Sequence, residues 1–447
     1  MRHTESYRMD NHTITDMSLV VALDRSGKLP GDIEIFAREI VRDGKEECPR
    51  LVYFQGGPGS PAPRPARIGG WINWALDHYR LVLLDERGTG SSHPLEATVV
   101  LERGEPAAQA DFLACFRADA MVADAEELRR ELQGDTPWHV LGQSYGGFIN
   151  TSYLSLAPEG LASVMITAGL PSVSEHAEET YRRTWRKLEE RHAALDPFPR
   201  MQERLWDLAV HVDTHEEYLP GGERLTPRRL RMLGIDLGRS TGPAHLHFLT
   251  EDPYLRLTGE RRLSDRFLTQ VEAALSYRTN PMYGIMHETI YAGTAPGATN
   301  WAAHRIREEF PQFAIPGTPA SPYATEREAR DAGASFRMSG EHVFPWQITD
   351  DPALAPMAEA ANILASRADF ASLYRPEVLA ENEVPTAAWV YWDDMFVPAD
   401  LSLATAAQIR GAQPILTNDY HHDGLGVDGP KLLERMHEVN ARALAAK

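Results

Sequence analysis

The stretch Gly142-Gln143-Ser144-Tyr145-Gly146 decides the fold class of this chain. It has the form G-x-S-x-G, follows a short apolar run at residues 139–141 and precedes a plausible helix start at residues 147–149. A serine hydroxyl is a poor nucleophile unless a sharp strand-to-helix turn exposes it beside a base, and a Cβ at the flanking positions would clash in such a turn. We therefore predict that Ser144 is a nucleophile between a strand and a helix.

Two more continuously apolar runs, at residues 51–54 and 81–84, resemble the one before Ser144. Continuous rather than alternating runs are typical of parallel strands that are covered on both faces. Residues 119–132 carry apolar residues at helical spacing, which predicts a crossover helix, so the pattern is a βαβ series with functional loops at the strand ends. Further strands are expected at residues 15–23, 33–41, 162–166, 384–391 and 414–416.

A mostly helical insertion interrupts this α/β pattern. From about residue 173, charged helical stretches follow one another without clear strands between them, at residues 175–195, 200–212 and 225–237. We expect residues 1–172 and 353–447 to form the two parts of one α/β core, and residues 173–352 to form a helical cap.

Composition excludes several classes of protein. The chain has 447 residues, 43% of them hydrophobic, so a sizeable core is available and disorder is not its main state. Its 64 acidic and 45 basic residues give a net charge of −19, which argues against nucleic acid or an anionic membrane as a partner. With only Cys48 and Cys115, and neither a leader-like segment nor a membrane-spanning apolar run, a cytoplasmic protein without a disulfide framework is expected.

The glycine-rich stretch Gln55-Gly56-Gly57-Pro58-Gly59 also follows an apolar run. Glycines there let backbone N–H groups converge on a developing oxyanion, and a position upstream of the nucleophile suits an oxyanion loop. A phosphate-binding loop is disfavoured because the chain has no G-x-x-x-x-G-K-[ST] motif and Gly88-x-Gly90 lacks a third glycine.

An acid and a base should follow the serine in that order. Asp393 and Asp394 come directly after the expected strand at 384–391, and His421 and His422 lie near the chain end; residue order alone leaves either member of each pair open. Metal chemistry is disfavoured, since adjacent histidines rarely chelate one ion and His287-Glu288 lacks the second histidine of H-E-x-x-H.

Several motifs spread over nearly the whole chain occur together. They are Gly56-Gly57-Pro58-Gly59, Asp85-Glu86-Arg87-Gly88-Thr89-Gly90-Ser91-Ser92, Gly142-Gln143-Ser144-Tyr145-Gly146-Gly147, Asp394-Met395 before Pro398, Tyr420-x-His422-Asp423-Gly424-Leu425, His287-Glu288-x-Ile290-Tyr291-Ala292, Thr299-Asn300-Trp301 and Gly340-Glu341-x-x-Phe344-Pro345-Trp346. Jointly they resemble the proline iminopeptidase (prolyl aminopeptidase) family of α/β-hydrolases, in particular its longer bacterial members. The resemblance implies an α/β-hydrolase fold, with a mostly parallel central sheet flanked by helices and a large helical cap.

The resemblance also implies a catalytic triad of Ser144 as nucleophile, Asp394 as orienting acid and His422 as base. Asp394 is favoured because the family's acid stands four residues before the proline, and His422 because the family's histidine lies in H-[DN]-G-L. The backbone N–H groups of Gly57 and Tyr145 are the expected oxyanion donors. One departure is Gln55, which stands where the family usually has histidine.

The implied activity is release of an N-terminal residue, preferentially proline, through an acyl-enzyme. Such an enzyme must recognise a free α-ammonium group, and a buried ammonium requires a carboxylate partner. The candidates in the cap are Glu288 and Glu341, then Glu178 and Glu179, with Trp301, Tyr291 and Phe344 as candidate walls for a pyrrolidine ring. A solvated helix face is the alternative for each acid, and ordinary core packing is the alternative for the aromatic residues.

Two other functions remain open from the sequence. The same triad suits an esterase, an amidase or a tripeptidyl-type peptidase, because the cap sets the substrate. A non-catalytic binding protein is disfavoured by the intact serine, acid and histidine. The expected chemistry requires neither a metal nor an organic cofactor, and the expected partners are short peptides with a free N-terminus, in an oligomeric state that the sequence leaves open.

Overall fold

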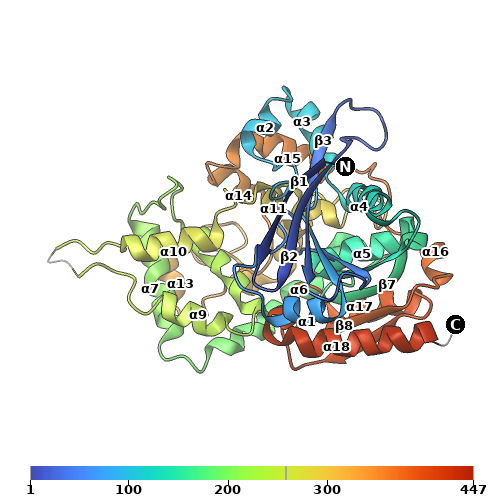
Figure 1. Cartoon of the computed structure of the whole chain (residues 1–447). Coiled ribbons are helices and arrows are strands. Elements are labelled where there is room, and N and C mark those ends of the chain that lie inside the picture. The colour runs from blue at the N-terminus through green and yellow to red at the C-terminus, as the bar shows by residue number, and fades with distance from the viewer. Residues whose placement is uncertain (1, 257–258, 446–447) are drawn as a thin grey trace.

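The structure is a computed structural model that describes residues 2–256 and 259–445, with the side chains of residues 2–4 left out. A nine-stranded sheet lies at its centre in the order β1-β2-β3-β5-β4-β6-β7-β8-β9 (Figure 1). The strands are β1 Arg2–Met9, β2 His12–Ala22, β3 Asp32–Arg42, β4 Arg50–Phe54, β5 Arg80–Leu84, β6 Trp138–Gln143, β7 Leu161–Thr167, β8 Thr386–Tyr391 and β9 Gln413–Thr417.

The sheet is mixed but mostly parallel, which confirms the expected fold class. Strands β4 to β9 pair in parallel, while β1, β2 and β3 pair antiparallel with one another and β3 pairs antiparallel with β5. Phe54 on β4 pairs with Gly142 on β6, and Gln143 pairs with Thr167 on β7. The carboxyl ends of these parallel strands therefore meet at one edge of the sheet, where ligands bind in open α/β sheets.

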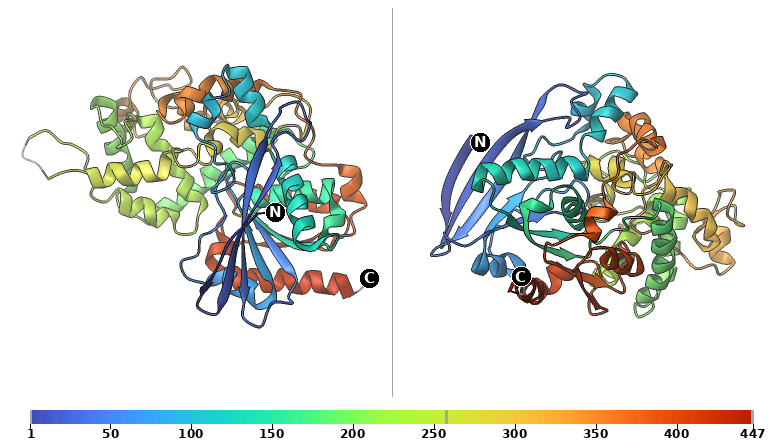
Figure 2. Two further views of the ribbon diagram at one scale, coloured as in Figure 1. Left: turned by 45° about the horizontal axis from the view of Figure 1, so that its top comes forward. Right: turned by 90° about the vertical axis from the view of Figure 1, so that its right-hand side faces the viewer.

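Helices cover both faces of the parallel strands, which explains their continuously apolar sequences. In β4, Val52 and Phe54 join the larger apolar core, whereas Leu51 and Tyr53 join a second core on the opposite face. Figure 2 shows the helices on the two sides of the twisted sheet. The helices of the core are α1 Gly70–His78, α2 Ala97–Leu101, α3 Pro106–Ala114, α4 Ala118–Gln133, α5 Tyr145–Leu156, α17 Ala399–Gln408 and α18 Gly424–Ala445.

A long helical segment separates β7 from β8, and part of it, including α7, α9, α10 and α13, forms the lobe on the left of Figure 1. Between residues 168 and 385, outside the undescribed pair 257–258, the structure has helices and two isolated β-bridges but no strand. The division into residues 1–172, 173–352 and 353–447 remains our proposal, and α15, beyond the proposed boundary, packs on α3. The helices are α6 Ala177–Arg191, α7 Met201–Thr214, α8 Pro227–Leu230, α9 Gly242–Leu249, α10 Asp265–Leu275, α11 Pro281–Met286, α12 Ala302–Ile306, α13 Glu326–Asp331, α14 Pro345–Asp350, α15 Ala358–Ser366 and α16 Pro376–Ala380.

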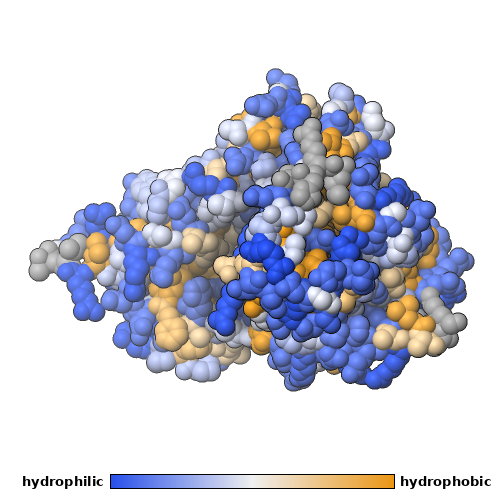
Figure 3. Space-filling view, viewed as in Figure 1, coloured by the Kyte–Doolittle hydropathy of each residue, from blue (hydrophilic) through white to orange (hydrophobic). Residues whose placement is uncertain are grey.

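The surface is mainly hydrophilic on the face shown in Figure 3, where hydrophobic residues form separate small patches. Across the described parts of the chain, no helix combines the length and the apolar character needed to cross a membrane.

Candidate active site

Ser144 lies on a strained turn between β6 and α5. Its backbone angles are φ 55° and ψ −124°, a combination that a non-glycine residue seldom adopts. The turn is so tight that a Cβ at Gly142 would lie 2.3 Å from the Gly146 carbonyl oxygen, and a Cβ at Gly146 would lie 2.1 Å from that of Phe54. Glycine is therefore required at both positions to place the Ser144 hydroxyl at the edge of the sheet.

Three distant stretches of chain meet at this hydroxyl. The Nε2 atom of His422 lies 2.8 Å from Ser144 Oγ, and its Nδ1 atom lies 2.8 Å from Oδ2 of Asp394. Asp394 follows β8, and its Oδ1 atom accepts hydrogen bonds from the backbone N–H groups of Phe396 (2.8 Å) and Val397 (3.0 Å), which fix the carboxylate. This is the arrangement by which a histidine can remove a serine proton.

Asp393 and His421, the sequence neighbours of Asp394 and His422, lie outside this hydrogen-bonded chain. Asp393 forms an ion pair with Lys187 on α6, with an Nζ–Oδ1 distance of 3.4 Å. No hydrogen bond among the described residues reaches Nδ1 of His421. The geometry thus distinguishes Asp394 and His422 from the alternatives that residue order left open.

The surroundings of His422 adjust its proton affinity. Burial disfavours the imidazolium, but the charge of Asp394 and its hydrogen bond to Nδ1 outweigh burial and raise the pKa of His422 above its usual value. The carboxylate of Glu341 also raises the pKa of His422. A raised proton affinity suits an imidazole that is to accept a proton from a serine hydroxyl.

Backbone N–H groups are available beside Ser144 for a developing negative charge. Tyr145 is the first residue of α5, so its N–H group has no acceptor within the helix. Gly57 lines the same cavity as Ser144, and a Cβ at Gly56 would lie only 2.9 Å from the Cβ of Ser144. The glycine-rich loop therefore lies directly against the nucleophile.

The residues after β5 hold this loop and the sheet together. The carboxylate of Glu86 accepts a 2.7 Å hydrogen bond from the backbone N–H of Gln55, whose Oε1 atom accepts one of 2.7 Å from the Tyr53 hydroxyl. Arg87 is fully buried and binds both carboxylate oxygens of Asp124 on α4, each at 2.6 Å. The Gln55 side chain is thus held by the Tyr53 hydroxyl, and its backbone N–H by Glu86, at the start of the loop.

A cavity of about 390 Å³ opens over Ser144 and His422. Core and cap both contribute to its walls, and charged and aromatic side chains converge in it as they do in small-molecule sites. Besides Ser144 and His422 it is lined by Tyr53, Gln55, Gly56, Gly57, Ser60, Trp71, Gln143, Ile235, Arg239, Tyr283, Glu341, Phe396, Asp423, Leu425 and Gly426.

Glu341 is the candidate acid that the structure brings to this cavity. Its Oε1 atom accepts a 2.6 Å hydrogen bond from the hydroxyl of Tyr283 on α11. Burial raises the pKa of Glu341 to about 7, although the positive charge of His422 acts in the opposite direction. The carboxyl therefore titrates near neutrality, which is typical of groups that bind or transfer charge in a functional site.

Glu288 lies deeper in the cap, outside the lining of the cavity. It is buried, its Oε1 atom accepts a 3.2 Å hydrogen bond from the backbone N–H of Ala303, and burial raises its pKa to about 7. Tyr291 packs edge-on against Tyr181 and Phe148, with ring centroids 5.6 and 5.9 Å apart, and also lies outside the lining.

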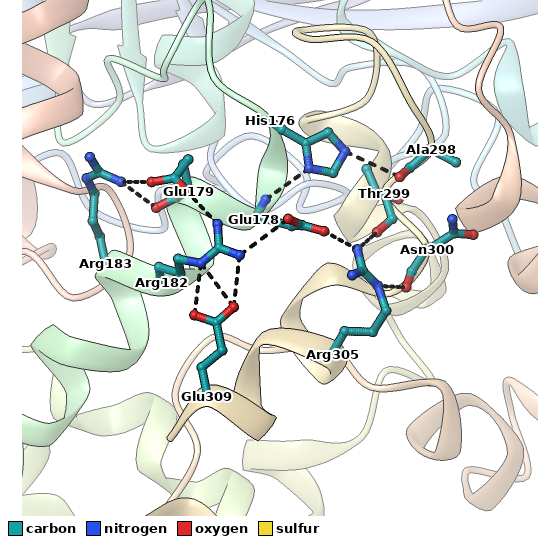
Figure 4. Close-up of polar contacts among 10 residues, drawn as sticks. All are labelled: His176, Glu178, Glu179, Arg182, Arg183, Ala298, Thr299, Asn300, Arg305 and Glu309. Atoms are coloured by element: carbon teal, nitrogen blue, oxygen red, sulfur yellow. Dashed lines mark hydrogen bonds and ion pairs between the residues drawn. The ribbon is translucent and has the colours of Figure 1, made fainter. Parts of the chain in front are cut away.

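Glu178 and Glu179 do not reach the cavity. Figure 4 shows both carboxylates on α6 enclosed by arginines: Glu178 lies 2.6 Å from Arg305, and Glu179 lies 2.5 Å from Arg182 and 2.8 Å from Arg183. Hydrogen bonds from Arg305 and from Arg183 lower the pKa of Glu178 and of Glu179, respectively. These acids are therefore neutralised by arginines and do not line the cavity over Ser144.

The aromatic residues Trp301 and Phe344 serve as packing groups in the cap. The Trp301 indole donates a 2.9 Å hydrogen bond to Asn362, and the buried Phe344 ring stacks on Trp346 at 5.3 Å. Neither lines the cavity, whose aromatic walls come from residues that sequence reasoning missed: Trp71, Tyr283, Phe396 and Tyr53.

Two further polar residues at the site were also missed. Asn280 begins α11, accepts from the Tyr283 N–H group and donates to the Pro58 carbonyl (3.4 Å) and to the hydroxyl of Ser60 (3.3 Å). Arg239 lines the cavity from the cap. Asparagine followed by proline is a helix-start signal, so the capping role of Asn280 could have been predicted from the sequence. Its contact with the loop at Pro58 and Ser60 could not.

No cluster of three or more histidine, cysteine, aspartate or glutamate residues suited to a metal ion occurs within residues 2–256 and 259–445.

Comparisons with known proteins agree with this architecture. A family described as the α/β hydrolase fold matches residues 49–220. The chain is 41% identical over 411 residues to a proline iminopeptidase of Aeromonas sobria, covering 91% of this chain and 92% of the relative. It is 29% identical over 415 residues to the proline iminopeptidase aneH of Aspergillus aculeatus, covering 91% and 88%. The solved proline iminopeptidase of Mycobacterium smegmatis aligns with 96% of this chain and all of its own at 14% identity, with a TM-score of 0.41. The chain belongs to the proline iminopeptidase family of α/β-hydrolases.

Proposed function

We propose that this protein is a prolyl aminopeptidase, a serine exopeptidase that releases an N-terminal residue, preferentially proline, from short peptides. The observation that carries the proposal is the cavity in which the carboxylate of Glu341 stands beside the hydrogen-bonded chain of Ser144, His422 and Asp394. The high identity to a proline iminopeptidase over nearly the full length of both chains supports it.

The proposed reaction is acyl transfer in two steps. His422 takes the proton of Ser144, and the alkoxide attacks the carbonyl carbon of the N-terminal residue. The N–H groups of Gly57 and Tyr145 stabilise the oxyanion, and one such donor typically lowers the barrier by about 3 kcal/mol. Asp394 stabilises the imidazolium, which then protonates the leaving amine; water, activated by His422, releases the acyl group and restores the serine.

Glu341 is the proposed partner of the substrate's α-ammonium group. A carboxylate in a partly buried site offsets the loss of hydration that an ammonium group suffers there. Because the carboxyl of Glu341 has a pKa of about 7, the approach of a cation favours its ionised form. An N-acylated peptide has no such charge and would leave the carboxylate unpaired.

Other parts of the proposal rest on fewer observations. The buried Glu288 and the partly buried Tyr291 are second candidates for the amine and ring subsite, whereas the arginine partners of Glu178 and Glu179 argue against a role in amine binding. The two unpaired cysteines suit the reducing conditions of the cytoplasm, where we propose that the protein acts.

The test is hydrolysis of the p-nitroanilides of proline, alanine and N-acetylproline, together with a tripeptide p-nitroanilide. We expect the proline amide to react fastest and the acetylated and tripeptide amides not to react, and we expect Ser144→Ala to lose activity by a factor of about 10⁴ or more. Equal rates with proline and N-acetylproline amides would instead support an esterase or amidase, and release of an N-terminal tripeptide would support a tripeptidyl peptidase. No covalent labelling of Ser144 by a serine-directed phosphonate would favour a binding protein.

A further inference from the structure

A positively charged side chain shares the active-site cavity with Glu341. Among the described residues that line this cavity, Arg239 is the only arginine or lysine. The chain as a whole carries a net charge of −19, so its field disfavours an anionic ligand unless a nearby cation compensates for it. Arg239 supplies such a cation in the cavity that also contains Ser144.

The two residues that flank Arg239, Gly238 and Ser240, form hydrogen bonds to the segment that contains His422. The carbonyl oxygen of Gly238 accepts a 3.1 Å hydrogen bond from the backbone N–H of His422. Ser240 donates to the carboxylate of Asp423 twice, from its hydroxyl at 2.7 Å and from its N–H group at 3.0 Å. The backbone of Arg239 is thus held beside His422, and the carboxylate of Asp423 is engaged by Ser240.

The guanidinium group of Arg239 keeps most of its hydrogen-bonding capacity. One ion pair holds it, an Nη1–Oδ1 distance of 3.3 Å to Asp236, whose other oxygen lies 2.6 Å from Nδ1 of His245. The side chain is 57% exposed. Because a guanidinium has five N–H donors in a planar fork, Arg239 can still bind a carboxylate through two parallel hydrogen bonds.

We infer that Arg239 binds the free C-terminal carboxylate of the residue that follows the cleaved bond, so that proline dipeptides are preferred substrates. The inference rests on the proposed prolyl aminopeptidase activity and assigns its substrate class. In such a dipeptide, an ammonium and a carboxylate group flank the scissile amide, one residue apart. The cavity offers a carboxylate at Glu341 and a guanidinium at Arg239 around Ser144, which matches both charges.

Electrostatics agree with this placement. The positive charge of Arg239 opposes the rise in the pKa of Glu341 and the rise in the pKa of His422, although other groups dominate both shifts. The charge of Arg239 therefore influences both Glu341, the proposed partner of the amine, and His422, the proposed base. A longer peptide has an amide where the dipeptide has its carboxylate, and it would gain nothing from this charge.

The test compares kcat/KM for prolyl-alanine and prolyl-alaninamide, which differ by one charge at the C-terminus. The full-length protein is measured as wild type, Arg239→Gln and Arg239→Lys, with Arg256→Gln as a matched control, since Arg256 is an exposed cap arginine that does not line the cavity. We expect wild type and the control to favour the free acid by about tenfold, the size of an interaction with a partly exposed charge. Arg239→Gln should bring this ratio near one, and Arg239→Lys should retain part of it.

An equal ratio in wild type and Arg239→Gln would overturn the inference, as would a wild type that favours the amide. Proline p-nitroanilide, which has no carboxylate, separates this failure from that of the proposed function. If the wild type hydrolyses the anilide without discriminating between the acid and the amide, only the role of Arg239 is refuted. If it hydrolyses neither the anilide nor the dipeptide, the proposed function fails and the inference falls with it.

Discussion

Replacing Glu341 by glutamine removes one negative charge from the cavity and changes little else. The glutamine side chain has the same length, and its carbonyl oxygen can still accept the hydrogen bond from Tyr283, which is 2.6 Å long in the native protein. The loss of activity in Glu341→Gln therefore measures the attraction between this carboxylate and a substrate's ammonium group.

The size of the effect follows from the burial of the pair. Losing one partner of a fully buried ion pair costs about 3–5 kcal/mol, and since Glu341 is only partly buried we expect about 2–3 kcal/mol. At about 1.4 kcal/mol per factor of ten, kcat/KM for proline p-nitroanilide should fall by a factor of about 30–150 at pH 8. Because the pKa of Glu341 is about 7, the carboxyl is mostly neutral at pH 6, where the difference between wild type and variant should shrink to about a tenth.

The assay is steady-state hydrolysis of proline p-nitroanilide at pH 6 and pH 8 by wild type, Glu341→Gln and Glu178→Gln. Glu178 is the matched control, because it is a cap glutamate that Arg305 and Arg182 neutralise away from the cavity (Figure 4). We expect the control to retain wild-type kcat/KM within about twofold, as for a surface substitution. A loss that is the same at both pH values, or one shared by Glu178→Gln, would refute the reasoning that a titrating carboxylate at residue 341 binds the amine.

Three more predictions concern the active site and the residues that hold its loops and the sheet in place. The kcat/KM of wild type should fall as the pH drops through about 7, the pKa of Glu341, because a protonated Glu341 no longer attracts the ammonium group. In Glu341→Gln the pH profile should show only the ionisation of His422, shifted to lower pH, since Asp394 still raises the pKa of His422 but the smaller contribution of Glu341 is gone. Asn280→Asp keeps the oxygen that caps α11 but loses the N–H donors to the Pro58 carbonyl and the Ser60 hydroxyl. We expect kcat to fall about 3–10-fold, with KM and the melting temperature nearly unchanged. A change in KM alone would contradict the idea that Asn280 positions the oxyanion loop. Arg87→Met removes two hydrogen bonds from the buried carboxylate of Asp124, which then keeps its ion pair with Arg25. It should lower the free energy of unfolding by about 2–4 kcal/mol in urea titrations, whereas a loss below about 1 kcal/mol would show that the ion pair of Arg87 with Asp124 is not needed for stability.

The strands and the strained turn that carries Ser144 could be predicted from sequence because their signals are local. Continuous apolar runs ending in glycine-rich loops predict buried parallel strands, and the structure has β4, β5 and β6 at residues 50–54, 80–84 and 138–143. The close approach of Gly142 and Gly146 to neighbouring backbone explains why the G-x-S-x-G pattern carries structural information. β1, by contrast, was not predicted, because its sequence is polar and its pairing with β2 is antiparallel at the edge of the sheet.

The ligand-facing residues of the cap could not be predicted in the same way. Which carboxylate faces the cavity depends on how short helices pack, and that packing has no periodic signature. Glu178 and Glu179 are an instructive exception, because Arg182 and Arg183 follow them at the three- and four-residue spacing of helix ion pairs. That spacing by itself favours a neutralised helix face over an amine site, whereas nothing in the sequence near Glu341 indicates its contact with Tyr283.

The arrangement of the cavity suggests how its chemistry and its selectivity are divided. The groups that activate the hydroxyl come from the ends of parallel strands, whereas the charges that would select the substrate, on Glu341 and Arg239, come from the helical segment between β7 and β8. The division is incomplete, because Glu341 raises the pKa of His422 while Arg239 opposes that rise. A substitution in the cap should therefore alter the pH dependence of the serine's activation as well as substrate choice. A substitution of Glu341 or Arg239 that changes specificity should therefore also change the proton affinity of His422.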